Sequence, residues 1–78
     1  MSIESEIETR IKAALDGNES LTENGDETRT VNIPNFEIDL PDVKTHPCVK
    51  SAYPNTENEN EFTVIVTIKK DIGVVRGW

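Results

Sequence analysis

Residues 61–69 carry the clearest alternation of apolar and polar positions in the chain. Their β-branched and aromatic side chains fall into two alternating sets, with Phe62, Val64, Val66 and Ile68 in one and Thr63, Ile65 and Thr67 in the other. A period of two in these residue types is typical of a strand that is buried on one face. The pattern predicts the central strand of an antiparallel sheet, with the first set facing the core and the second set facing outward.

Residues 2–16 repeat instead with the period of an amphipathic helix. Apolar side chains recur every three or four positions, at Ile3, Ile7, Ile11 and the Ala14–Leu15 pair. Ser2 or Ser5 is suited to cap the first turn, and Gly17 is suited to end the last one. The charged side chains are spaced as i,i+4 ion pairs, Glu6 with Arg10 and Glu8 with Lys12. The spacing predicts one helix with a narrow apolar stripe.

The polar segment after this helix contains the dipeptide Asn24-Gly25. This pair is the strongest short signal for a two-residue hairpin turn, because both residues tolerate a positive φ. It predicts a short ribbon in which residues 20–23 pair with residues 26–30.

Two alternating runs follow, in residues 28–33 and 36–40, and Pro34-Asn35 separates them. The inward side chains are expected to be Val31, Ile33, Phe36, Ile38 and Leu40. Glu37 and Asp39 are expected to face outward, on the same face of the sheet as Thr63, Ile65 and Thr67. Proline cannot adopt the positive φ of a tight hairpin turn, so the runs are predicted to form one long edge strand with a bulge or bend at Pro34. Residues 41–47 are predicted to be a connecting loop.

The remaining strand signals are weaker. Residues 48–53 predict a strand in which Val49 and Tyr53 share a face, and residues 54–60 predict a loop rich in Asn and Glu. Residues 72–78 predict a short last strand. The predicted fold is α+β: one N-terminal amphipathic helix packs on one face of a small antiparallel sheet of four to five strands, in two layers, as a single domain of residues 1–78.

The charge of the chain narrows the range of partners. Fifteen acidic residues outnumber eight basic ones, which gives a net charge of −7, and the pI is about 4.5. Such a surface repels phosphate backbones and anionic lipids, so we expect neither direct nucleic-acid binding nor membrane binding. The first residues lack the basic and apolar regions of a secretory signal. We therefore expect a soluble protein in the cytoplasm, or in the host cytoplasm or virion of a virus, that is not secreted.

One segment has the spacing of a calcium-binding loop. Oxygen-bearing side chains occupy its ligand positions, at Asp16, Asn18, Ser20, Thr22, Asn24 and Glu27. Leu21 stands where the sharp turn of such a loop requires glycine, and the residues after Glu27 have a strand pattern rather than a helical one. We therefore favour an Asx-rich turn and expect no metal ion or other cofactor.

His46 and Cys48 place an imidazole and a thiol close together in the sequence. A structural zinc site needs four ligands, and a cysteine nucleophile needs the imidazole to reach its sulfur. Pro47 between the two residues makes that geometry unfavourable, so we interpret both as structural. The sequence contains no other acid–base pair or phosphate-binding motif, and we expect that the protein is not an enzyme.

Two functional interpretations follow. The first is a protein-binding or assembly module that joins a partner protein or a second copy of itself, such as a small subunit or accessory protein of a phage particle or mobile element. Its candidate contact residues are Thr63, Ile65, Thr67 and Trp78, the last of which either contacts a partner or folds back onto the core. The alternative is an acidic inhibitor that mimics nucleic acid and occupies the basic groove of a nucleic-acid-handling complex. Its candidate contact residues are Glu57, Glu59 and Glu61.

Overall fold

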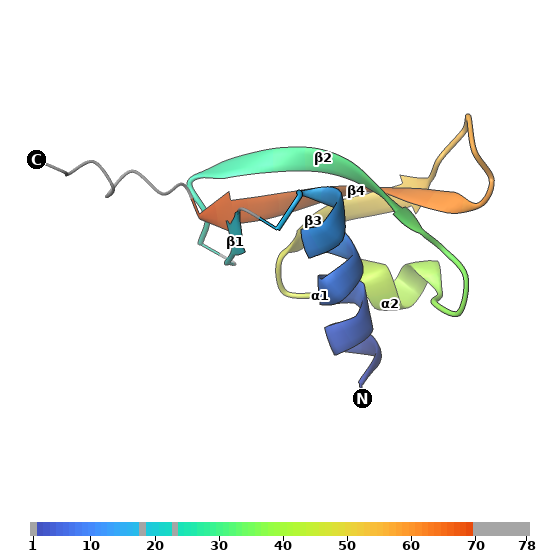
Figure 1. Cartoon of the computed structure of the whole chain (residues 1–78), viewed down its shortest axis with the longest axis horizontal. Helices are drawn as coiled ribbons and strands as arrows, with labels where there is room; N and C mark the ends of the chain where they lie inside the picture. The colour runs from blue at the N-terminus through green and yellow to red at the C-terminus, as the bar shows by residue number, and fades with distance from the viewer. Residues whose placement is uncertain (1, 18, 23, 70–78) are drawn as a thin grey trace, which may run out of the picture.

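The computed structural model describes residues 2–17, 19–22 and 24–69. Its elements in chain order are α1 (Ile3–Ala14), β1 (Ser20–Leu21), β2 (Glu27–Pro34), α2 (Leu40–Lys44), β3 (Val49–Pro54) and β4 (Glu61–Lys69). An N-terminal helix and a four-stranded antiparallel sheet confirm the predicted α+β class (Figure 1). The predicted last strand at residues 72–78, including Trp78, lies outside the described residues.

β4 is the centre of the sheet, as its sequence pattern predicts. It pairs antiparallel with β2 along one edge and with β3 and β1 along the other. Its inward side chains Val64, Val66 and Ile68 are at most 1% exposed. Because each of the other strands in the described part of the chain pairs with β4, this one segment organises the sheet.

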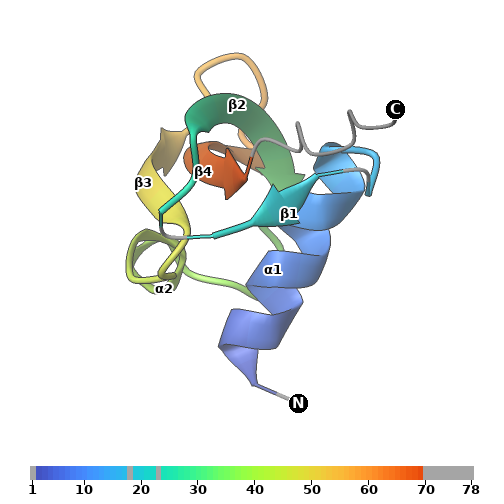
Figure 2. The ribbon, with the colours of Figure 1, turned by 90° about the vertical axis from the view of Figure 1, so that its left-hand side faces the viewer.

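α1 packs against β2 through the predicted apolar stripe. Ile7 and Ile11 are fully buried and Leu15 is nearly so. Ser2 caps the helix, because its hydroxyl accepts a hydrogen bond of 3.1 Å from the Ser5 backbone N–H. Ile3 is 41% exposed, since the first turn extends away from the sheet (Figures 1 and 2).

A second helix, α2, replaces the predicted strand and loop. β2 ends at Pro34, the chain turns at Glu37 with φ of 65°, and α2 begins at Leu40. The two-residue alternation that predicts a strand is also compatible with a turn followed by a short helix, and Pro41 fits the first turn of a helix, where no N–H is needed. The predicted strand of residues 28–33, with Val31 and Ile33 inward, is confirmed within β2. Its predicted continuation through residues 36–40 is therefore wrong.

The inward side chains predicted for this segment are only partly correct. Ile38 is 6% exposed and joins the core, and Leu40 packs against it. Phe36 is 61% exposed instead. The turn after β2 changes the direction of the chain, so the alternation of β2 does not continue to Phe36.

The predicted ribbon of residues 20–23 against 26–30 is also wrong. β1 and β2 lie on opposite edges of β4, where Leu21 and Glu27 both pair with Ile68. The connection between them crosses the C-terminal end of β4. Figure 2 views this end of β4 nearly along the strand. Gly25 lies in this crossing, and a Cβ at that position would be 2.1 Å from the Ile68 carbonyl oxygen. Glycine is therefore required for close approach to a backbone rather than for a hairpin turn.

β3 contains a bulge that changes which of its side chains share a face. The register with β4 shifts between Val49 and Ser51. As a result Val49 and Ala52 face the core, whereas Tyr53 is 47% exposed. The predicted common face of Val49 and Tyr53 is wrong, because the extra residue in the bulge reverses the alternation.

The core lies between the sheet and the two helices, which both cover the same face (Figures 1 and 2). Its buried apolar residues are Ile7, Ile11, Leu15, Val31, Ile33, Ile38, Val43, Ala52, Val64, Val66 and Ile68. The opposite face of the sheet is covered by no helix of the described residues. Neither described helix has the length and apolar character needed to cross a membrane.

Candidate functional site

The uncovered face of the sheet is formed by side chains from three adjacent strands. Residues that are directly opposite each other in an antiparallel sheet point to the same side. The register therefore places Thr28 beside Thr67 and Ile65 between Thr30 and Ser51. It also places Thr63 between Asn32 and Tyr53. We call these residues the outer face: Thr28, Thr30, Asn32, Ser51, Tyr53, Thr63, Ile65 and Thr67. The sequence predicts the three from β4, and the structure adds those from β2 and β3. The sequence also predicts Glu37 and Asp39 on this face, which is wrong, because both lie between β2 and α2 rather than in a strand.

The paired side chains that form the outer face are uncharged, although 29% of the chain is charged. Lys50 is exposed beside this face, in the bulge between Val49 and Ser51, where it has no opposite residue in β4. Glu61 and Lys69 lie at the two ends of β4 and bound it. Arg29 of β2 is opposite Val66 and therefore points to the helix side of the sheet. Its guanidinium contacts carboxylate oxygens there, Glu19 Oε1 at 2.8 Å and Glu27 Oε2 at 3.2 Å. The charge of Arg29 is thus directed away from the outer face.

Hydrogen bonds from the hydroxyls of Thr63 and Thr67 order this face. The Thr63 hydroxyl donates to Asn32 Oδ1 at 2.8 Å and connects β4 to β2. The Thr67 hydroxyl donates to the Thr22 carbonyl at 2.7 Å. Ile65, at the centre, is partly buried by its neighbours. The hydroxyl and amide groups are therefore held in place by the sheet, and Ile65 and Tyr53 provide the apolar surface.

The acidic residues of the alternative interpretation lie at one end of the molecule, in the connection between β3 and β4 and at the start of β4. Glu57 and Glu59 are exposed. Asn side chains fix the backbone around them: Asn55 Oδ1 accepts from the Glu57 N–H at 2.8 Å, and Asn35 Nδ2 donates to the Glu59 carbonyl at 2.9 Å. Glu61 is already part of β4, and its carboxylate accepts from Asn55 Nδ2. The structure therefore presents Glu57 and Glu59 on an ordered loop but not Glu61.

The residues of the calcium-loop alternative do not converge. Ser20 and Glu27 lie on opposite edges of β4, and the Glu27 carboxylate contacts Arg29. Asp16 follows α1 with φ of 69°, and Asn18 lies outside the described residues. Within residues 2–17, 19–22 and 24–69, no group of three or more His, Cys, Asp or Glu side chains could hold a metal ion.

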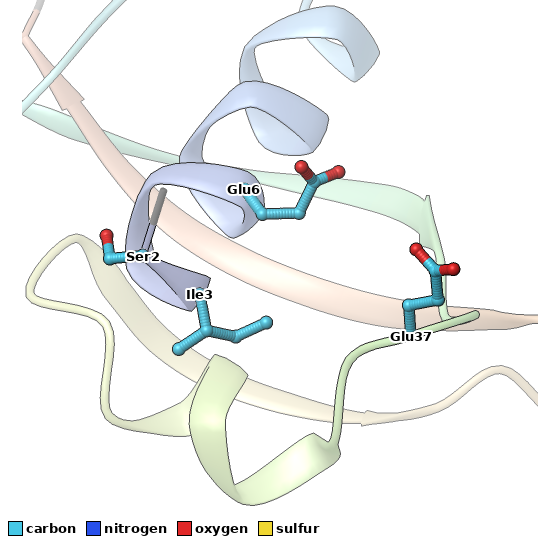
Figure 3. A pocket seen from close by; sticks show the side chains of 4 residues that line it. All are labelled: Ser2, Ile3, Glu6 and Glu37. Atoms are coloured by element: carbon cyan, nitrogen blue, oxygen red, sulfur yellow. The ribbon is translucent and has the colours of Figure 1, made fainter.

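An open hollow of about 290 Å³ lies between the start of α1 and the turn before α2 (Figure 3). It is lined by Ser2, Ile3, Glu6 and Glu37. The last three project toward the opening, and Glu6 also binds Arg10. These lining groups are at least partly exposed to solvent, whereas small-molecule sites are enclosed and mainly apolar. The hollow does not define a ligand site.

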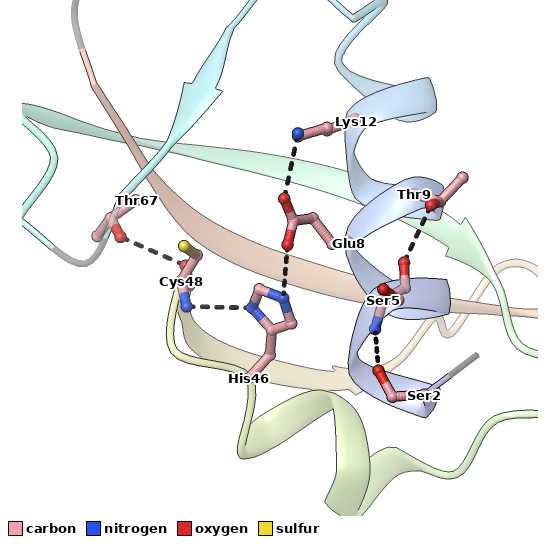
Figure 4. Close-up of polar contacts among 8 residues, drawn as sticks. All are labelled: Ser2, Ser5, Glu8, Thr9, Lys12, His46, Cys48 and Thr67. Atoms are coloured by element: carbon pink, nitrogen blue, oxygen red, sulfur yellow. Dashed lines mark hydrogen bonds and ion pairs between the residues drawn. The ribbon is translucent and has the colours of Figure 1, made fainter.

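His46 is buried and has a structural contact with Cys48. Its Nδ1 accepts a hydrogen bond of 3.1 Å from the Cys48 backbone N–H, and its Nε2 lies 3.9 Å from Glu8 Oε1 (Figure 4). Glu8 binds Lys12 Nζ at 3.1 Å through its other oxygen. The imidazole therefore binds the backbone of Cys48. This hydrogen bond fixes the turn into β3.

Arg10 has a role that sequence reasoning missed. The predicted ion pair with Glu6 is present at 2.9 Å, but the arginine is only 8% exposed. Its Nη1 donates to the Pro34 carbonyl at 3.0 Å and the Phe36 carbonyl at 2.6 Å, and its guanidinium lies 4.3 Å from the centre of the Phe36 ring. Arg10 thus connects α1 to the end of β2. The sequence contains one signal for this burial: the helical spacing of Arg10 places it beside Ile7 and Ile11, on the buried side of the helix.

Comparisons with protein-family models, with curated protein sequences and with solved structures find no match to this chain.

Proposed function

We propose that this protein acts without catalysis as a protein-binding module, a small subunit or accessory protein of a larger assembly, and that a partner protein covers the outer face. The observation that supports this most is the absence of charge from the outer face of a strongly acidic chain. The centres of protein interfaces are depleted of charged residues and enriched in aromatic ones. Tyr53 and Ile65 supply a half-exposed aromatic ring and an aliphatic centre for such a contact.

The charged surface around the outer face gives this module a preference among partners. A net charge of −7 repels acidic proteins and attracts proteins with basic surfaces, and such steering acts mainly on the association rate. The partner we expect therefore has a polar, uncharged contact surface with basic residues at its rim.

Replacing Ile65 with glutamate tests this function, because it places a carboxylate at the centre of the outer face. We expect the Ile65→Glu variant to remain folded, since the side chain points away from the core, and to lose at least about 10-fold in affinity for the partner. The measurement is titration calorimetry of the complex isolated from the native source. Ala14→Glu is the matched control, because Ala14 is exposed at the end of α1. Unchanged affinity in a folded Ile65→Glu variant would contradict the proposal.

The second candidate function is the acidic inhibitor of a nucleic-acid-handling complex. It is favoured by the ordered loop that presents Glu57 and Glu59, since preorganised groups lose less entropy on binding. Under this function the loop, rather than the outer face, enters the partner. The two candidates therefore predict different contact residues on the same molecule.

A further inference from the structure

The two edges of the sheet differ in how they are protected. β3 is interrupted by the bulge between Val49 and Ser51 and ends at Pro54. β2 pairs with β4 without interruption from Glu27 to Pro34. Among the described residues, no strand pairs with the other edge of β2. Bulges and prolines are devices that prevent edge-to-edge pairing, and β2 has neither between Thr28 and Asn32.

The free edge of β2 presents the backbone groups of its even-numbered residues. The Asn35 N–H donates to the Asn60 carbonyl at 3.1 Å, in the same register as the β2–β4 pairs. Because backbone groups in an antiparallel strand alternate between the two edges, the odd-numbered residues bond to β4. The N–H and C=O groups of Thr28, Thr30 and Asn32 therefore point outward. Pro34 ends this edge, since it has no N–H and its carbonyl accepts from Arg10.

We propose that β2 pairs antiparallel with β2 of a second copy of this chain, with Thr30 opposite Thr30 on the two-fold axis. In this register Thr28 lies opposite Asn32 of the second copy, and each pair exchanges both of its backbone hydrogen bonds. A shift of two residues in one direction places Thr28 opposite Pro34, which lacks a donor. A shift in the other direction moves Asn32 beyond the end of the partner strand. Only the register centred on Thr30 uses all the outward groups.

The charge distribution favours a second copy at this edge. Two chains of net charge −7 repel each other over most of their surfaces, but Thr28, Thr30 and Asn32 are uncharged. Arg29 faces the helix side, where it contacts carboxylates of its own chain. Threonine pairs directly opposite each other are favourable in antiparallel sheets. Pairing of the two β2 strands also joins the outer faces of the two chains into one surface. The dimer therefore enlarges the surface of the proposed function, but the pairing itself does not depend on that function.

Disulfide trapping tests the register. In a Cys48→Ser background, Thr30→Cys places two cysteines opposite each other with Cα atoms about 5.5 Å apart, within the range that a disulfide spans. Thr28→Cys is the matched control, because the two cysteines would be offset by four residues, about 13 Å along the strand. We expect Thr30→Cys to form a covalent dimer under mild oxidation and Thr28→Cys to stay monomeric. Mixing Thr28→Cys with Asn32→Cys chains is expected to restore cross-linking.

Sedimentation equilibrium of the unmodified chain provides the second readout. We expect the wild type to have twice the chain mass of 8.7 kDa. We expect the Thr30→Pro variant to have the mass of a monomer, because proline lacks the outward N–H. A wild-type monomer at millimolar concentration, or equal cross-linking of Thr30→Cys and Thr28→Cys, would overturn the pairing. Either result leaves partner binding by the outer face intact. Conversely, Ile65→Glu is expected to weaken partner binding without changing the mass, so the two proposals fail separately.

Discussion

Replacing Gly25 with alanine is expected to destabilise the protein by about 3 kcal/mol or more. The added Cβ would lie 2.1 Å from the carbonyl oxygen and 2.5 Å from the carbonyl carbon of Ile68. These are backbone atoms of the central strand, so they cannot move aside as a flexible side chain would. To accommodate the methyl group, the crossing between β1 and β2 must separate from β4. Urea unfolding followed by circular dichroism measures the change.

Gly17 provides the matched control, because no atom lies within 4 Å of a Cβ placed there. Its φ of 71° gives Gly17→Ala a conformational cost of about 1–2 kcal/mol. We therefore expect Gly25→Ala to be clearly the more destabilising of the two. Equal effects would show that the crossing does not pack on the backbone of Ile68.

Replacing Arg10 with lysine is expected to reduce the free energy of unfolding by about 2 kcal/mol or more. Lysine keeps the positive charge, but a single ammonium group cannot replace a planar guanidinium that contacts Glu6 and the carbonyls of Pro34 and Phe36 together. At least one partly buried acceptor then loses its donor. Thermal unfolding of the variant measures the loss.

Lys12 is the control for this substitution, because it forms an i,i+4 pair of the same kind with Glu8 on the same helix. Its side chain is 48% exposed, and exposed ion pairs of this kind contribute little to stability. We expect Lys12→Ala to change stability by less than about 0.5 kcal/mol. If Arg10→Lys were as neutral as Lys12→Ala, the contacts of Arg10 with the end of β2 would not contribute to folding.

The sequence predicts α1 and β4 because their side chains repeat over many residues with a single period. In β4, alternation from Phe62 to Ile68 leaves one interpretation, and its bounds are the observed ones. In α1, Ile7 and Ile11 define a stripe that tertiary packing then uses. Long runs of one period determine both the type of element and its buried face.

Short segments were predicted less well, because tertiary contacts decide them. The alternation from Phe36 to Leu40 is too short to separate a strand from a turn and the start of a helix, and Pro41 favours the helix. Asn24-Gly25 has the composition of a hairpin turn. Its glycine serves instead the close contact with Ile68, a residue more than forty positions away. No local pattern records such a contact.

The candidate site could be predicted only in part for the same reason. Thr63, Ile65 and Thr67 follow from the alternation of β4, but their neighbours Thr30 and Tyr53 follow only from the register of β2 and β3. The bulge in β3 moves Tyr53 to the outer face. The lack of charge on this face becomes visible only when the three strands are side by side.

Photo-cross-linking in the native source tests the central claim, that a partner protein covers the outer face. Three variants each carry the photoreactive residue p-benzoylphenylalanine at one position. It replaces Tyr53 on the outer face in the first and Glu59 on the acidic loop in the second. In the third it replaces Phe36, an exposed aromatic residue on the helix side, as a control. We predict that Tyr53→p-benzoylphenylalanine cross-links to a protein other than a second copy of this chain, and that the variant at Phe36 does not. Cross-linking at Glu59 or Phe36 with none at Tyr53 would contradict the claim.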